Sequence, residues 1–153
     1  MASLQTQLSV GLPGLPADRL DQVVRRIARE GHVRRNTAVR WFDELLKFLD
    51  VCANTDAPVS PSPRVDKAWH VFIIFTRDYR SFCAARYGTF IHHDPMEKKD
   101  AEAYERAYLE AEARYGDLPR RIWPPPASRA GGWGIGGCGG VGCGGGCGGG
   151  GGC

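Results

Sequence analysis

The sequence contains no apolar run that approaches the roughly 18 to 20 residues a membrane-spanning helix requires. Its first 16 residues also lack the basic start and the continuous apolar stretch of a secretory signal. From these absences we expect no membrane partner and a cytoplasmic location, where thiols stay reduced. The six cysteines are therefore interpreted as free thiols, metal ligands or modification sites in preference to a disulfide framework.

Familiar catalytic motifs are missing as well. The sequence has no phosphate-binding glycine loop, no G-x-S-x-G elbow and no H-E-x-x-H zinc motif. Its net charge of +3 is too small to identify a partner. Six arginines lie close together in the sequence: Arg25, Arg26, Arg29, Arg34, Arg35 and Arg40. We interpret them as a solvated helix face and do not expect nucleic-acid binding.

Composition divides the chain into two unlike parts. Of the 23 residues from 131 to 153, 16 are glycine and four are cysteine, so this segment has almost no side chains to bury. The preceding residues have the mixed apolar and charged composition of a globular domain. We therefore predict an N-terminal extension over residues 1–16, a helical domain over 17–126 and a disordered glycine- and cysteine-rich tail over 127–153.

Apolar residues recur at helical spacing through most of the domain, and no strand pattern emerges. The spacing predicts an all-α bundle of about four helices over residues 17–30, 37–52, 63–87 and 94–115. The run Trp123-Pro124-Pro125-Pro126 favours an extended strap over the bundle. The helices are expected to pack through eight large residues: Trp41, Phe42, Leu45, Phe48, Trp69, Phe72, Tyr79 and Tyr108.

The ends of these helices carry recognisable signals. Gly31 is expected just past the first helix, and Asn36 or Thr37 can cap the second. Ser62, followed by proline, favours the start of the third helix, which we expect to continue unbroken until Gly88 stops it. Asp94 opens a capping box and predicts the start of the fourth.

A pair of polar residues on the third predicted helix has the spacing of metal ligands. Asp66 and His70 are four residues apart, so their side chains lie on one side of a helix. If the chain folds back, His92 or His93 would complete a set of oxygen and nitrogen ligands suited to zinc or another divalent metal. On an unbroken helix these histidines begin about 30 Å from Asp66. The site therefore requires a kink, a long return or a second molecule.

Two other interpretations of these residues remain open: one needs no metal ion, and the other gives the pair a catalytic role. Asp66 can orient or neutralise His70 within the fold, while His92 and His93 form a capped turn. Asp66 and His70 can also serve a small metal-dependent hydrolase. Cys83 cannot join His70 on a straight helix, and we interpret it as a buried thiol. We favour a non-catalytic binding or interaction module over an enzyme.

The same region resembles a known family. The residues that carry the resemblance are Val65-Asp66-Lys67-Ala68-Trp69-His70, then Tyr79, Cys83 and Gly88, then Phe90-Ile91-His92-His93-Asp94-Pro95. They resemble the bacterial glycine-rich domain-containing proteins, which are similar to part of the plant glycine-rich domain proteins. The resemblance implies the helical fold, the tail and a structural motif at Trp69, Tyr79 and Cys83, and it implies no enzymatic activity. Where the plant pattern has a second histidine this chain has Phe72, so one possible ligand is missing.

The tail has its own chemistry. Its thiols are spaced C-x4-C-x3-C-x5-C, at Cys138, Cys143, Cys147 and Cys153. Three interpretations remain open: a flexible interaction tether with reactive thiols, a trap for thiophilic ions such as zinc or copper(I), and a substrate whose cysteines are modified. A protein partner or a modifying enzyme is expected in the first and third cases.

Overall fold

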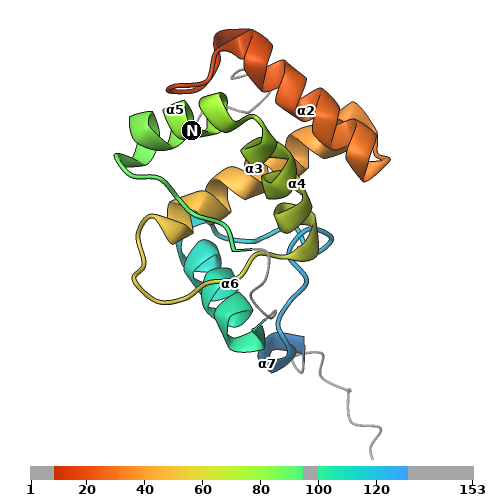
Figure 1. Ribbon diagram of the computed structural model, residues 1–153. Coiled ribbons are helices and arrows are strands. Elements are labelled where there is room, and N and C mark those ends of the chain that lie inside the picture. Colours follow the sequence, from red (N-terminus) through yellow and green to blue (C-terminus); the bar gives the residue numbers. More distant parts are fainter. Residues whose placement is uncertain (1–8, 95–99, 131–153) are drawn as a thin grey trace, which may run out of the picture.

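The computed structural model describes residues 9–94 and 100–130, which form helices and no strand. The prediction of an all-α domain is confirmed, but the described part of the chain has six delimited helices rather than about four (Figure 1). Their bounds are α2 Ala17–Gly31, α3 Arg35–Cys52, α4 Pro63–Ile74, α5 Thr76–Tyr87, α6 Ala101–Tyr115 and α7 Ala127–Ala130. The tail cysteines lie outside the described residues. None of the helices within the described ranges is both long and apolar enough to cross a membrane.

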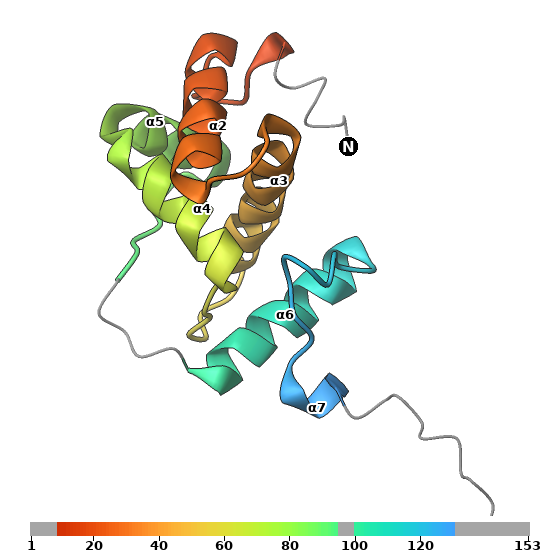
Figure 2. The same ribbon diagram turned by 90° about the vertical axis from the view of Figure 1, so that its right-hand side faces the viewer.

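Helix α3 is the centre of the fold. It packs against α2 and α4 on one side and against α6 on another, so three helices bury their apolar faces on it (Figure 2). Phe42 of α3 meets Phe72 of α4 edge to face, with 5.2 Å between ring centroids. All eight predicted packing residues are buried. Burying a side chain of this size stabilises the fold by about 1.5–3 kcal/mol each.

The turn between α2 and α3 differs from the prediction. Gly31 is the last residue of α2, and His32 follows it in the left-handed conformation with φ of 51°. Gly31 is required because a Cβ there would lie 2.9 Å from the Trp41 ring. Helix α3 then begins at Arg35 with no side-chain cap, so the predicted caps Asn36 and Thr37 lie inside its first turn. The tight connection, closed by backbone hydrogen bonds back to α2, starts the helix early.

The third predicted helix is broken in two. Ser62 caps α4 as predicted, accepting a hydrogen bond from the Val65 N–H, and Gly88 ends α5 with φ of 71°. Between them Phe75 leaves helical geometry with ψ of 60°. An unbroken helix of this span would be about 36 Å long and would run past the core. The break turns α5 back, so that both halves pack on the same core.

Contacts with α2 hold this break in place. The Arg19 guanidinium lies 5.6 Å from the centre of the Phe75 ring, and its Nη2 donates to Asp78 Oδ2 at 2.6 Å. Asp78 belongs to the first turn of α5, where a negative charge is also favoured by the helix dipole. The tertiary contact therefore fixes where the new helix starts.

The fourth predicted helix begins later than expected. Asp100 caps α6 by accepting from the Glu102 N–H at 2.9 Å, so the predicted start at Asp94 was wrong for this helix. Asp94 itself is not helical, and residues 95–99 lie outside the described part of the chain. The helix ends before Gly116, as the sequence predicts.

Segments at both ends of the bundle belong to the packed domain. Leu12 and Leu15, which fall in the predicted N-terminal extension, are buried and exchange backbone hydrogen bonds. At the other end residues 117–126, here called the strap, turn back across α6 toward α3 (Figure 2). Trp123 of the strap is fully buried and donates its indole N–H to Glu44 of α3 at 2.9 Å. Helix α7 occupies the first residues of the predicted tail.

Candidate metal centre

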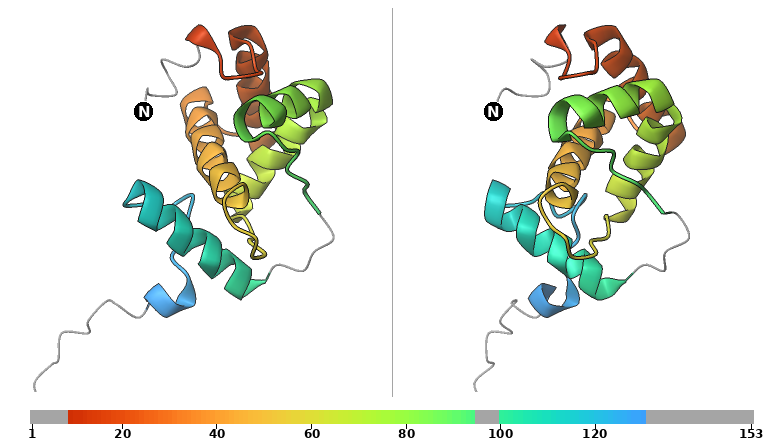
Figure 3. Two further views of the ribbon diagram at one scale, coloured as in Figure 1. Left: turned by 90° about the vertical axis from the view of Figure 1, so that its left-hand side faces the viewer. Right: turned by 60° about the vertical axis from the view of Figure 1, so that its left-hand side comes forward.

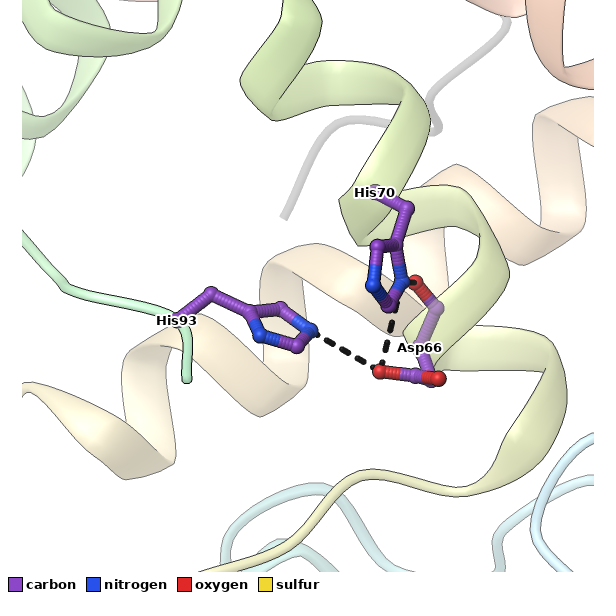
Figure 4. A group of neighbouring side chains, drawn as sticks. All are labelled: Asp66, His70 and His93. Carbon is purple, nitrogen blue, oxygen red and sulfur yellow. Dashed lines mark hydrogen bonds and ion pairs between the residues drawn. The ribbon is translucent and has the colours of Figure 1, made fainter. Parts of the chain in front are cut away.

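Three polar side chains converge beside the first two turns of α4. The ligand atoms of Asp66, His70 and His93 all lie within 4.8 Å of one another (Figure 4). The His93 Nε2 lies 2.9 Å from Asp66 Oδ1, and the His70 Nδ1 lies 3.5 Å from the same oxygen. His93 is nearly buried, with 8% of its side chain exposed, whereas His70 is 49% exposed. The cluster is therefore anchored in the fold on one side and open on the other.

Helix α4 supplies two of these groups in a fixed orientation. Because Ser62 caps the helix, Asp66 and His70 lie one turn apart on the same side. The His70 Nδ1 is also 2.9 Å from the backbone oxygen of Asp66. A carbonyl oxygen can only accept, so Nδ1 of His70 carries the proton. In this tautomer the lone pair is on Nε2, so Nε2 is the nitrogen that would bind an ion.

The third group arrives from the segment after α5. Figure 3 shows residues 88–94 running back alongside α4, a path that the break at Phe75 makes possible. The distance of about 30 Å expected for an unbroken helix does not arise, because α5 turns away from the line of α4 at Phe75 and the segment after α5 returns toward the start of α4 (Figure 3). Of the three routes that the sequence left open, the kink followed by a short return is the one present.

A chain of buried hydrogen bonds fixes the position of residues 88–94. The indole N–H of Trp69 donates to the Tyr79 hydroxyl at 2.9 Å, and that hydroxyl donates to the Ile91 backbone oxygen at 2.8 Å. The Trp69 ring also packs against the His93 ring, with centroids 4.3 Å apart. Burial raises the pKa of Tyr79 well above its ordinary value, so its hydroxyl stays protonated and can donate. The motif residues Trp69 and Tyr79 thus position His93.

The cluster lies in the wall of an open cleft of about 430 Å³. The opposite wall is the loop of residues 53–61, and segment 89–94 forms the third side. This loop is held to α6 by the hydrogen bond from the Arg106 Nε to the Pro58 oxygen at 3.0 Å. A metal bound at the cluster would therefore face a space large enough for water or a small ligand.

One predicted metal ligand, His92, does not join the cluster. His92 is exposed and packs against the Phe90 ring, with centroids 4.8 Å apart, so only one histidine of the pair reaches Asp66. Cys83 is fully buried in the core. The prediction that Cys83 is a buried thiol is confirmed, although the helix that carries it is broken at Phe75 and is not straight. The four tail thiols, Cys138, Cys143, Cys147 and Cys153, lie outside the described residues.

The loop of residues 53–61 and Cys52, which precedes it, line the site although the sequence did not predict a role for them there. Cys52, which the sequence places on the apolar face of α3, lines the cleft. Burial raises the pKa of its thiol to about 12, so the thiol is neutral and a poor metal ligand at neutral pH. The proline- and serine-rich composition of residues 53–63 marked a loop directly before the Asp66 helix, and this was the available signal.

Comparison with known proteins identifies a family for the helical domain. A family model described as UCP032817-like matches residues 18–112, which include the whole Asp66, His70 and His93 cluster. This match corrects the predicted resemblance to the glycine-rich domain-containing proteins, which was wrong. The motif lies in the helical domain of an uncharacterised family, and the matched region ends before the glycine-rich tail. No curated protein and no solved structure matches the chain.

Proposed function

The chain belongs to the UCP032817-like family, and we propose that the matched domain is a non-catalytic module that binds a divalent metal ion, zinc by preference. The ligands are Asp66, His70 and His93. The observation that carries the proposal is the convergence of three ligand atoms within 4.8 Å, from two segments that the fold brings together.

The separations fit a tetrahedral ion after small movements. Oxygen and nitrogen ligands bind zinc at about 2.0–2.2 Å, which places neighbouring ligand atoms about 3.3 Å apart. The atoms of Asp66 and His93 are 2.9 Å apart, joined by a hydrogen bond. Replacing that shared proton by the ion requires them to separate by a few tenths of an ångström. The more exposed His70 can adjust by rotating its ring.

The groups behind the ligands support the same assignment. Metal-binding histidines commonly donate their second ring N–H to a carbonyl or carboxylate, which fixes the tautomer. His70 makes this contact with the Asp66 backbone oxygen. Two imidazoles and one carboxylate suit zinc better than calcium or magnesium, which prefer oxygen ligands. Three protein ligands leave one position of a tetrahedral ion open toward the cleft.

We expect about one zinc ion per chain in full-length protein purified without a histidine tag. The tail thiols are removed from the test by replacing all four tail cysteines with serine, which leaves the chain length unchanged. Elemental analysis after zinc loading and gel filtration gives the stoichiometry. Markedly sub-stoichiometric zinc in the serine-substituted chain would refute the site.

The identity of the ligands is tested by ligand variants and a control variant, all made in the serine-substituted chain. His93→Ala and Asp66→Asn are expected to weaken zinc binding by more than about 100-fold, because a direct ligand should matter more than the outer contacts that cost 10–100-fold. His92→Ala is the matched control, since it removes an adjacent, exposed imidazole and should leave affinity unchanged. Competition with a chromophoric chelator gives the constants. Equal losses of zinc affinity in His93→Ala and His92→Ala would contradict the assignment of His93 as a ligand.

A further prediction concerns the hydroxyl that fixes the return segment. Tyr79→Phe leaves the buried Trp69 N–H and Ile91 oxygen without their partner, so the unfolding free energy should fall by about 1–3 kcal/mol. Zinc affinity should fall about tenfold, because His93 is less firmly held. Tyr108→Phe is the control: that buried residue's hydroxyl makes no hydrogen bond to another described residue. Unchanged zinc affinity in Tyr79→Phe would show that the Tyr79 hydroxyl does not position His93 for metal binding.

A second candidate function is favoured by the cleft itself. An ion with three protein ligands and an open position can bind and acidify water, which is the arrangement of hydrolytic zinc enzymes. The alternative of a small metal-dependent hydrolase therefore rests on the same ligands. It is distinguished by turnover: zinc-loaded protein should hydrolyse simple esters or phosphoesters, and His93→Ala should abolish that rate. Binding without turnover supports the non-catalytic module.

A further inference from the structure

A second and larger cavity, of about 850 Å³, is separate from the metal centre. It lies between α3, the first turn of α4 and the strap, and we call it the basic groove. Five cationic side chains line it: Arg40, Lys47, Arg64, Arg120 and Arg121. Two acidic side chains, Glu44 and Asp117, also line it. The groove therefore carries a net positive charge, and its cations come from three separate segments.

Most of this charge is not neutralised by the protein. Lys47 is bound to Glu44 at 2.7 Å, and Glu44 also accepts from the Trp123 indole. The four arginines make no ion pair with any residue in the ranges 9–94 and 100–130. Like charges gathered in one concave surface repel one another and raise the local concentration of anions. An anionic ligand would relieve that repulsion.

The arginine cluster seen in the sequence differs from this groove. Arg25 and Arg35 both pair with Asp21, and Arg26 pairs with Glu30. Half of the six clustered arginines are thus engaged in ion pairs on the helix surface. Arg40 is the one member that lines the groove. The positive site is created by folding, because α4 and the strap bring distant arginines to α3.

Below the arginines the groove has an apolar floor. Trp41, Leu118 and Ile122 line it, each only 6–7% exposed, together with Val33. Guanidinium groups bind phosphate oxygens in pairs, and a largely apolar floor favours a planar or apolar group beside them. The volume is within the range of small-molecule sites, about 300–1,000 Å³. These features together describe a ligand with several phosphates attached to a ring.

We propose that the basic groove binds a small molecule with two or more phosphate groups and a planar ring, of the nucleoside di- or triphosphate class. Arg120 and Arg121 of the strap contact the phosphates, with Arg40 and Arg64 opposite them. The ring lies on the apolar floor near Trp41. This site does not depend on the metal centre, since none of the proposed metal ligands lines the groove.

The test titrates ATP into full-length protein by calorimetry in magnesium-free buffer of low ionic strength. Arg120→Gln with Arg121→Gln should weaken binding about tenfold or more, since each exposed guanidinium contributes a charge-assisted contact. Arg77→Gln with Arg80→Gln is the matched control. It removes the same charge from α5, where both of these arginines are exposed and lie outside the groove. His93→Ala should bind ATP like the unaltered protein.

Three further probes separate this ligand from its alternatives. Tripolyphosphate should bind more weakly than ATP because it lacks the ring, and adenosine should not bind measurably. Absence of ATP binding, or equal losses in the groove and control variants, would overturn the proposal. Adenosine binding as tightly as ATP would remove the role of the arginines and overturn it too. A single-stranded oligonucleotide that binds far more tightly than ATP would assign the groove to nucleic acid instead.

Discussion

Replacing Trp123 with alanine should lower the unfolding free energy by about 3–5 kcal/mol, as expected for removing a buried tryptophan. Trp123 is fully buried, stacks on Tyr104 with centroids 6.4 Å apart and contacts Phe48. Its loss leaves a cavity between α3 and α6 and removes a hydrogen bond from Glu44. Urea denaturation followed by far-UV circular dichroism measures the change.

Trp123→Phe separates packing from hydrogen bonding at this position. Phenylalanine keeps most of the ring contacts but cannot donate to Glu44, which retains its contact with Lys47. A hydrogen bond to a charged group contributes about 1.5–3 kcal/mol, so this variant should be intermediate. A loss below about 1 kcal/mol for Trp123→Ala would show that the strap does not belong to the folded unit. That result matters because the strap lies beyond the family match, which ends at residue 112.

The regular features of the fold could be predicted because each has a local cause. The apolar stripes gave the approximate helices, and Ser62 and Gly88 marked true helix ends because their capping chemistry acts within a few residues. The start of α3 could not be predicted in the same way. The chain has good caps at Asn36 and Thr37, but α3 begins at Arg35 without a side-chain cap, directly after a turn that the Val33 N–H closes on the Ala28 oxygen.

The break at Phe75 left no comparable signal. Neither proline nor glycine interrupts residues 64–87, and the apolar stripe continues from Phe72 to Tyr79 without a change of period. The cause is tertiary, because Arg19 of α2 contacts both the Phe75 ring and Asp78. A local rule cannot detect a partner almost 60 residues away.

Only the part of the candidate site that lies on one helix could therefore be predicted. The spacing of Asp66 and His70 identified a pair on one helix face from local geometry alone. Choosing His93 over His92 required the break and the hydrogen bond from Tyr79 to the Ile91 oxygen, which decides which imidazole turns inward. The basic groove was not predictable at all, because its arginines are adjacent only after α4 and the strap have packed on α3.

A half-buried polar cluster around Asp50 is expected to control stability. The Asp50 carboxylate accepts from Arg86 through both Nε and Nη2, at 3.0 and 2.9 Å, and from the hydroxyls of Tyr87 and Tyr115 at 2.7 and 2.6 Å. These bonds join α3 to α5 and α6. Burial alone would raise the pKa of Asp50, but the bonds from Arg86, Tyr115 and Tyr87 outweigh it and hold the pKa below its ordinary value.

Asp50→Asn should lower the unfolding free energy at pH 7 by about 2–4 kcal/mol. Removing one partner of a buried ion pair costs about 3–5 kcal/mol, and the lower figure allows for the 27% exposure of Arg86, which can still reach water. The amide also turns an N–H group toward a guanidinium. Asp43→Asn, two turns earlier in α3, is the control: Asp43 makes no side-chain bond to a described residue, and its change should stay within about 0.5 kcal/mol.

The pH dependence of this difference identifies the ionised carboxylate as its source. Because the pKa of Asp50 is lowered in the folded state, its contribution is fully present above the ordinary value of 3.8. It is lost as the pH falls through the lower folded-state value, since the unfolded chain takes up the proton first. The gap between Asp50→Asn and the unaltered protein should therefore be largest near neutral pH and shrink below about pH 4. A gap that stays constant into strong acid would mean that asparagine disturbs packing and that the charge of Asp50 contributes nothing.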